Sequence, residues 1–259
     1  MFPDSEIGIP SVLDIRVALY FRCMQDLPTF FEKFDSGQFQ LLSEESHHHA
    51  RHVLRLQEGD TCYIVNGQGT RLLVRIAGAD KKQTRVDVLE EFQEAAAKQK
   101  LSIGVSFTKN PARMEWFLEK ATEVGIHEII PLITRRSERQ HFKRERFEKI
   151  LISAMLQSRQ TYLPVLHEPT SLSAVLLGSN IQGGIAHCMP DEAKINMRQF
   201  AQPDQHQLIL IGPEGDFSPE EIEESKGAGF KAITLGAQRL RTETAALVAV
   251  VQWHQALMG

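Results

Sequence analysis

The chain has 259 residues and a formal net charge of −4, with 42% hydrophobic and 24% charged residues. This composition is typical of globular domains and excludes disordered and fibrous proteins. The slightly acidic balance argues against a protein that coats nucleic acid along its whole surface. The length allows one large domain or two ordinary ones.

Membrane and secretory signals are not expected in this sequence. The apolar run AALVAVV at 245–251 is far shorter than the roughly 18 residues that a membrane-spanning helix needs. The first ten residues, MFPDSEIGIP, lack the basic start and apolar core of a secretory signal. Cys23, Cys62 and Cys188 are odd in number and share no metal-like spacing, which favours a reducing cytoplasm.

The first part of the chain has the pattern of a small all-β domain. Short segments rich in β-branched and aromatic residues, VALYF, TCYIV and RLLVRI, occur before Leu89 and are separated by turn signals. The NGQG turn at 66–69 predicts a hairpin between the last two. The polar segment EEFQEAAAKQK at 90–100 is the expected linker. We therefore assign residues 14–92 to a first domain and residues 100–259 to a second.

After the linker, predicted strands alternate with predicted helices. Apolar segments that predict buried strands occur at 101–107, 126–133, 183–188, 207–211 and 231–235. Apolar residues at helical spacing predict one buried helix face at Met114, Phe117, Leu118, Ala121 and Val124, and another at Phe147, Ile150, Leu151 and Ala154. The alternation predicts a mostly parallel sheet with helices on both faces.

Two polar loops follow predicted strands in the second domain, LIGPEGDFSPEE at 210–221 and GAQRLRTETAA at 236–246. Ser218, Pro219 and Glu221 predict that a helix begins directly on the first loop, with a capping box between the serine and the glutamate. Open α/β sheets bind ligands at the carboxyl ends of their strands. Because we expect the two strands to be adjacent, both loops should line one pocket.

The residues of these loops indicate what such a pocket binds. The first loop lacks the glycine and lysine patterns of phosphate-binding loops, and Glu214 and Asp216 would repel a phosphate. The second loop carries Arg239 and Arg241. Its alternative interpretation is a charged surface turn with a threonine capping the next helix. Together the loops favour a polar, cationic or zwitterionic ligand held by main-chain groups, beside an anionic second substrate.

Two other stretches leave alternatives open. The run RRSERQHFKRERFEK at 135–149 holds seven Lys or Arg against three Glu, which indicates either a solvated helix face with compensating pairs or an anionic partner. The histidines of 47–49 and His52 suggest a metal site, but consecutive side chains alternate in an extended segment and cannot all face one point. Contact with RNA, a helix start and a plain surface remain as alternatives for these histidines.

The loops LIGPEGDFSPEEIE at 210–223 and LGAQRLRTETAAL at 235–247 together resemble the signature of the 16S ribosomal RNA uridine N3-methyltransferases (RsmE-type) of the SPOUT superfamily. The resemblance extends over most of the chain, to ESHHHARHVLRLQEGD at 45–60, EKATEVGIHEIIPLITRRSE at 119–138 and RFEKILISAMLQSRQTYLP at 146–164. Asp216 and Leu156 depart from the family pattern, in which many members have glycine and glutamate.

The resemblance implies an N-terminal PUA-like RNA-binding β-barrel and a C-terminal SPOUT α/β domain with a deep trefoil knot. It implies S-adenosylmethionine as the cofactor, 16S RNA in an assembled or nearly assembled small ribosomal subunit as the partner, and a cytoplasmic homodimer without metal or membrane. The implied cofactor-binding residues are Leu210, Ile211, Gly212, Pro213, Glu214, Gly215, Leu235, Gly236, Arg239, Leu240 and Thr242.

Methylation at N3 of uridine requires loss of a weakly acidic proton and stabilisation of the resulting anion. We expect Arg241 to stabilise this anion, because a guanidinium group keeps its proton near neutral pH. Glu243 or a water molecule is the expected proton acceptor. The arginines expected to contact RNA phosphate, as a local basic track on an acidic protein, are Arg51, Arg55, Arg135, Arg136 and Arg159.

The last helix is predicted to form a dimer interface. Apolar or small residues surround nearly its whole circumference from Ala245 to Val251, which favours burial on more than one side. A second copy would cover the side that the helix's own sheet leaves open, whereas the alternative is a helix wholly buried in one domain. Two other functional classes are a knotted RNA-binding module without catalysis and a nucleotide-dependent enzyme, and the missing phosphate lysine disfavours the latter.

Overall fold

The computed structural model describes residues 27–35, 39–137, 142–178, 181–190 and 193–258. The chain divides into two compact units, residues 1–94 and 95–259. The expected strand VALYF and Cys23 lie outside the described residues. None of the described helices is long and apolar enough to cross a membrane.

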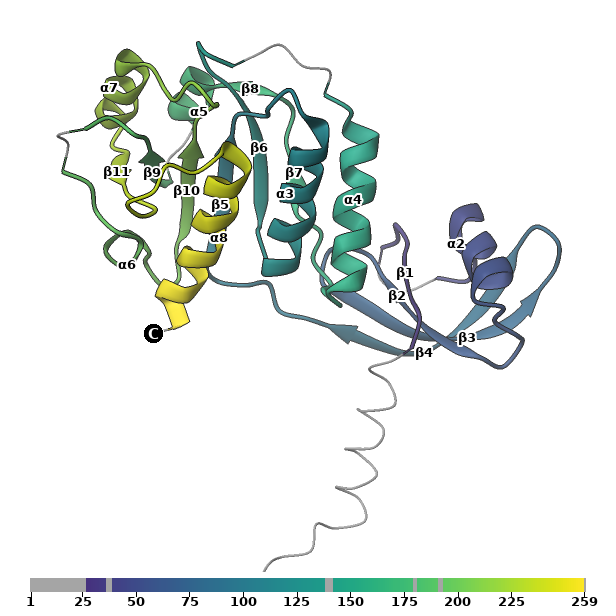
Figure 1. The fold of residues 1–259 in the computed structure, drawn as a ribbon. Helices are drawn as coiled ribbons and strands as arrows, with labels where there is room; N and C mark the ends of the chain where they lie inside the picture. Colours follow the sequence, from purple (N-terminus) through teal and green to yellow (C-terminus); the bar gives the residue numbers. More distant parts are fainter. Residues whose placement is uncertain (1–26, 36–38, 138–141, 179–180, 191–192, 259) are drawn as a thin grey trace, which may run out of the picture. The chain divides into compact units, whose positions relative to one another are not determined.

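The first unit is built on a four-stranded sheet in the order β1-β2-β3-β4. Its elements are β1 Thr29–Phe31, α2 Glu44–His48, a π-helical turn His49–Val53, β2 Thr61–Val65, β3 Thr70–Ala79 and β4 Thr84–Gln93 (Figure 1). The predicted hairpin is confirmed, because β2 and β3 pair antiparallel as far as Val65 and Arg71. Gly67 and Gly69 in its turn have φ of 74° and 94°, a region that favours glycine.

The consecutive histidines of the first unit lie in helical turns, so the extended segment assumed from the sequence was wrong. Ser43 caps α2, its hydroxyl accepting from the backbone N–H of Ser46. His47 is buried, and its Nδ1 lies 2.7 Å from Oγ1 of Thr84. The exposed rings of His48 and His52 lie one helical turn apart, with centroids 4.8 Å from each other. No group of three or more metal-ligating side chains suited to hold an ion occurs among the described residues.

The second unit contains a seven-stranded sheet in the order β11-β9-β10-β5-β6-β7, with β8 also paired to β6. Its strands are β5 Lys100–Val105, β6 Glu128–Ile133, β7 Val165–Leu166, β8 Thr170–Ser171, β9 Gln182–Ala186, β10 His206–Ile211 and β11 Lys231–Ile233. Every pairing is parallel, as predicted. The expected adjacency of β10 and β11 is wrong, because β9 lies between them.

Helices cover both faces of this sheet (Figure 1). They are α3 Pro111–Val124, α4 Arg144–Gln157, α5 Leu172–Gly178, α6 Met197–Phe200, α7 Pro219–Gly227 and α8 Thr242–Met258. The central strand β10 shows how the two cores form, since successive side chains point to opposite faces. Ile209 and Ile211 pack with α3, α4, α6 and α8, whereas Leu208 and Leu210 pack with α5 and α7.

The predicted buried face of α3 is confirmed at every position except Val124, which is 38% exposed. The helix ends there, and Gly125, with φ of 108°, turns the chain away from the helical path. On α4, Phe147 and Leu151 are buried as predicted, and Ile150 is partly buried. The amphipathic pattern therefore located both helices and failed only at a helix end.

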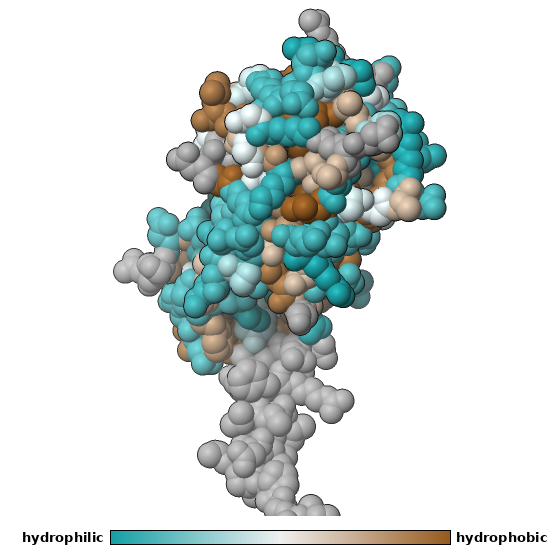
Figure 2. All heavy atoms as spheres, turned by 90° about the vertical axis from the view of Figure 1, so that its left-hand side faces the viewer, coloured by the Kyte–Doolittle hydropathy of each residue, from teal (hydrophilic) through white to brown (hydrophobic). Residues whose placement is uncertain are grey.

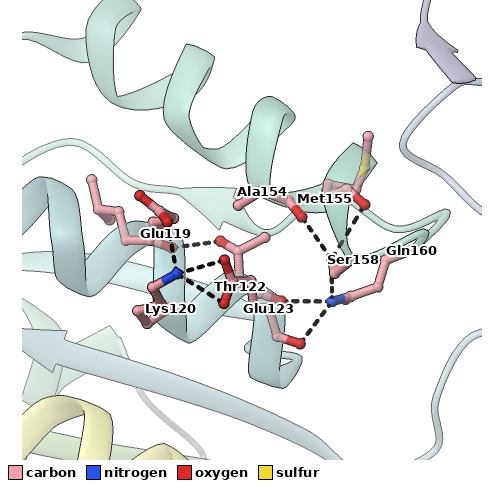
Figure 3. A network of polar contacts seen from close by, with 9 residues as sticks. Glu119, Lys120, Thr122, Glu123, Ala154, Met155, Ser158 and Gln160 are labelled. Carbon is pink, nitrogen blue, oxygen red and sulfur yellow. Dashed lines mark hydrogen bonds and ion pairs between the residues drawn. The ribbon is translucent and has the colours of Figure 1, made fainter.

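A polar network fixes the C-terminal end of α3 (Figure 3). Nε2 of Gln160, in the turn after α4, donates to the backbone carbonyls of Thr122 at 2.7 Å and Glu123 at 3.2 Å, and also contacts the hydroxyl of Ser158. Carbonyls in the last turn of a helix have no partner within the helix. Gln160 supplies that partner, so α3 is anchored at the end opposite to its first turn.

The surface in Figure 2 shows how apolar side chains are distributed on one face of the molecule. On that face, apolar side chains of the described residues form separate patches between hydrophilic ones. Apolar side chains scattered over a surface are ordinary in monomeric proteins. They do not by themselves indicate a docking surface.

Candidate active site

A cavity of about 450 Å³ in the second unit lies where β9 and β10 end. The volume is within the range of about 300–1,000 Å³ that is typical of small-molecule sites. Both polar loops line it, as predicted, together with the first turn of α3 and the end of β9. The lining residues are Arg113, Ala186, Cys188, Ile211, Gly212, Pro213, Glu214, Asp216, Arg239, Leu240, Arg241, Thr242 and Ala245.

Some residues expected at the site do not line this cavity. They are Leu210, Gly215, Leu235, Gly236 and Glu243. Leu210 is fully buried in the core beneath α5 and α7, because side-chain alternation along β10 directs it away from Ile211. Leu235 packs instead against the core on the opposite face of the sheet. Leu210 and Leu235 therefore belong to the cores on the two faces of the sheet.

The first loop ends in the predicted capping box. Oγ of Ser218 accepts from the backbone N–H of Glu221, and Oε2 of Glu221 accepts from the N–H of Ser218 at 2.8 Å. Such a cap contributes roughly 1 kcal/mol to helix stability. The other carboxylate oxygen of Glu221 accepts from the backbone N–H of Arg135 at 2.7 Å. The start of α7 is thus tied to the segment that follows β6.

Two arginines predicted to bind RNA contact this first loop. Nη1 of Arg136 donates to the carbonyls of Gly215 at 2.6 Å and Phe217 at 3.4 Å. Nη1 of Arg135 lies 3.0 Å from Oε2 of Glu220 in an exposed ion pair. Arg136 therefore supports the backbone of the loop, a role that its place in a basic run did not indicate.

Asp216 holds an unusual backbone conformation at the edge of the cavity, with φ of 63°. Glycine adopts this region without strain, and aspartate is among the residues that tolerate it. One carboxylate oxygen accepts from the backbone N–H of Cys188 at 2.8 Å, and the other from that of Phe217 at 2.8 Å. The Asp216 side chain thus joins the first loop to the segment after β9.

The part of the second loop that precedes α8, with Thr234 and Leu235 before it, has fewer supports than the first loop. Nε2 of Gln252 on α8 donates to the carbonyl of Leu235 at 3.1 Å, and Nη2 of Arg239 donates to the carbonyl of Glu214 at 3.3 Å. Arg241 is exposed, and its guanidinium group forms no hydrogen bond or ion pair with any described residue. This charge is available to a ligand.

The first helical turn of α8 joins the two loops. Oγ1 of Thr242 donates to the carbonyl of Gly212 at 3.1 Å, so it does not serve as the helix cap considered from the sequence. Glu243 is buried, and its Oε1 lies 3.7 Å from Nε of Arg113. Nη1 of Arg113 also donates to Oε1 of Glu214 at 3.0 Å. The arginine contacts acidic groups from both sides of the cavity.

Sequence reasoning missed three residues that line the cavity: Arg113, Ala186 at the end of β9, and Cys188 shortly after it. A signal for Arg113 was present, because Asn110 and Pro111 start a helix shortly after a predicted strand. The strand before Cys188 was also predicted. The position of that strand, β9, between β10 and β11 depends on pairing between segments far apart in the chain, and a local sequence pattern does not indicate such pairing.

Comparison with known families decides the class of protein to which this site belongs. A model described as "RNA methyltransferase domain" matches residues 95–254, and one described as "RNA methyltransferase PUA domain" matches residues 42–89. This chain belongs to the RNA methyltransferase family. Ribosomal RNA small subunit methyltransferase E of Rickettsia conorii is 29% identical over 220 residues, covering 84% of this chain and 90% of that protein. The Bacillus subtilis protein of the same name is 27% identical over 238 residues, covering 83% and 89%.

Solved structures agree with this family. A "probable rRNA-methyltransferase" from Porphyromonas gingivalis superimposes with a TM-score of 0.84 at 36% identity, covering 89% of this chain and 98% of that chain. The small subunit methyltransferase E from Neisseria gonorrhoeae, bound to S-adenosyl methionine, gives a TM-score of 0.77 at 26% identity, covering 88% and 97%. The predicted RsmE-type family is confirmed, and so is an α/β fold with a PUA domain.

Proposed function

We propose that this RNA methyltransferase uses S-adenosylmethionine to methylate N3 of a specific uridine in 16S ribosomal RNA. The observation that carries the proposal is the cavity where the two polar loops meet, with the free guanidinium group of Arg241 on its wall. The relatives named for methylation of small-subunit ribosomal RNA, and the related structure with bound cofactor, support the substrate and the cofactor.

The residues of the cavity fit this cofactor. The cavity has the volume of a small-molecule site, and its wall is partly the backbone of a loop that contains Gly212 and Pro213. Arginines lie beside the acidic side chains Glu214 and Asp216, so the wall carries both signs of charge that a zwitterionic ligand needs. When bound, the cofactor supplies an electrophilic methyl group.

The chain's own contribution is to position the uridine and stabilise its anion. Loss of the N3 proton places negative charge on the base, and Arg241 is the cation free to meet it. A guanidinium group does not release its proton near neutral pH, so Arg241 cannot be the base. Glu243 and water are the candidate acceptors for that proton.

The finer features of the proposal concern fold and assembly. Residues 14–92 form a PUA-like barrel that binds RNA, and residues 100–259 form a SPOUT domain with a trefoil knot. Two copies associate through α8, whose residues Leu247, Val248 and Val251 are only partly buried within one protomer. The RNA is presented within an assembled or nearly assembled small subunit in the cytoplasm, and Arg51, Arg55, Arg135, Arg136 and Arg159 contact its phosphates.

The test uses small ribosomal subunits from a strain that lacks the gene. Incubation with the protein and S-adenosylmethionine should add one methyl group at one uridine, located by mass mapping of RNA fragments and identified as 3-methyluridine by chromatography against a standard. Arg241→Ala should lower kcat by about 10²- to 10³-fold at saturating cofactor and RNA. Near-normal turnover of this variant would contradict the role of Arg241, and unmodified RNA would contradict the function itself.

A further inference from the structure

One arginine outside both loops contacts acidic side chains at both. Arg113 lies in the first turn of α3, and its Nη1 donates to Oε1 of Glu214 at 3.0 Å. Its Nε lies 3.7 Å from Oε1 of Glu243. Glu214 belongs to the loop after β10, and Glu243 follows the loop after β11. A single side chain therefore spans the two segments that form the cavity.

The contact with Glu243 is the stronger candidate for an energetic role. The Glu243 side chain is only 8% exposed, whereas that of Glu214 is 62% exposed. Exposed ion pairs contribute little, but a buried carboxylate without a compensating cation is costly. Within the part of the chain that the structure describes, Arg113 is the cation within ion-pairing distance of Glu243. The Oε2 atom of Glu243 is buried and has no hydrogen-bond partner among these residues.

Arg113 is carried by an element that is fixed at both ends. Asn110 caps α3, its side chain accepting from the backbone N–H of Ala112 at 3.1 Å. At the other end, Gln160 donates to the last carbonyls of the helix (Figure 3). A functional side chain on a rigid element is positioned more accurately than one on a loop. The guanidinium group is thus a fixed point against which two loops are held.

We propose that Arg113 is a positioning residue that holds the two loops at the separation the cofactor requires, with Glu243 as its buried counter-ion. The proposal rests on the proposed function, because it concerns the same cavity. In this proposal Glu243 supports the site as the counter-ion of Arg113, and water is the acceptor of the uridine N3 proton. Only Thr242 separates Arg241 from Glu243 along the chain, and fixing the carboxylate therefore also restricts Arg241.

The test is calorimetric titration of the full-length chain with S-adenosylmethionine in the absence of RNA. Arg113→Gln and Glu243→Gln should each weaken cofactor binding by about tenfold. The double variant should bind like Arg113→Gln alone, because that change already removes the contact with Glu243. Glu214→Gln should weaken binding less than Glu243→Gln does, by about threefold, since its half of the contact is exposed. Arg113→Lys, which keeps the charge, should recover part of the loss.

The matched control is Arg146→Gln, which removes an Arg–Glu pair between α4 and Glu115 of α3 and leaves the cavity untouched. Its affinity should equal that of the wild type. Amide hydrogen exchange without cofactor gives a second readout: Arg113→Gln should raise exchange in both loops and leave α4 unchanged. If the Arg113→Gln variant does not fold, the cofactor affinities of Arg113→Lys and Glu243→Gln, each compared with that of the wild type, test the positioning role instead.

The outcomes separate this inference from the proposed function. Arg113→Gln affinity within twofold of wild type, or losses that add in the double variant, would overturn the positioning role. Glu243→Gln with normal cofactor affinity but abolished turnover would assign Glu243 as the proton acceptor and overturn its assignment as a counter-ion. A folded wild-type protein that does not bind S-adenosylmethionine would instead refute the proposed function.

Discussion

The two loops of the cavity differ in how the protein holds them. The loop after β10 is supported from several directions, by Arg136 on its carbonyls, by the Asp216 carboxylate on the N–H of Cys188, and by the capping box of α7. The loop after β11 has few such bonds, and its main-chain supports come from Gln252, from the hydroxyl of Thr234 and from the carbonyl of Ile195.

This difference suits the two loops to different roles, the first to binding the cofactor and the second to the chemical step. A loop whose backbone is held by its own protomer offers a preformed surface, which lowers the ordering cost of binding a cofactor. The loop with Arg241 has free side-chain charge but little support, so a second protomer at α8 is the element that would order it. The comparison predicts that disturbing the proposed dimer harms the second loop, and that disturbing Arg136 harms the first.

The largest effect is expected from Val248→Glu on α8. Val248 is only partly buried within the chain, and a charge there would be unpaired inside the proposed apolar interface. We expect a soluble monomer with cofactor binding weakened by at least about 100-fold, measured by sedimentation and titration. The control is Gln255→Glu, at an exposed position of the same helix. A monomer that binds S-adenosylmethionine normally would break the link between dimer and second loop.

A smaller effect is expected from Arg136→Ala, which tests the first loop. The change removes a charged donor from the carbonyls of Gly215 and Phe217. Because the guanidinium group is exposed, we expect cofactor affinity to fall by about three- to tenfold, with the same oligomeric state as the wild type. Arg135→Ala, which loses an exposed ion pair with Glu220, is the matched control and should bind cofactor normally. Equal losses in both variants would indicate a general folding defect.

The smallest effect is expected at the amino ends of the strands, away from both loops. Burial lowers the pKa of His206, whose Nε2 lies 2.7 Å from Oγ of Ser102, and burial also lowers the pKa of His127. The unfolded chain, with a histidine pKa of about 6.5, then binds more protons than the folded protein as pH falls. The stability contributed by these neutral histidines is therefore present above about pH 6.5 and declines below it, levelling off under the lowered folded pKa.

Urea unfolding at a series of pH values between about 5 and 8 measures this dependence. His206→Asn should flatten the acid side of the curve while leaving cofactor affinity at neutral pH unchanged. An unaltered curve would show that the burial of His206 has no bearing on acid stability. The result bears on the comparison of the two loops, because it measures the stability of the sheet independently of how well the loops are ordered.

Local patterns located most elements of the second unit. The residue Ser218 and the glutamate three positions later predicted the start of α7, and that start is confirmed with both hydrogen bonds of the box. Helical spacing likewise located the buried face of α3 and erred only at Val124, where the helix ends. Caps and amphipathic faces depend on residues close together in the chain, so sequence alone specifies them.

The sequence also determined the family, the parallel sheet and the two loops that line the cavity, because these depend on local motifs. Only the tertiary structure decided that β9 separates β10 from β11, which brings Cys188 to the cavity. It also decided that Arg113 contacts Glu214 and Glu243, residues more than a hundred positions away. Such contacts arise from strand order and packing across the sheet, and no periodicity within a single segment encodes them.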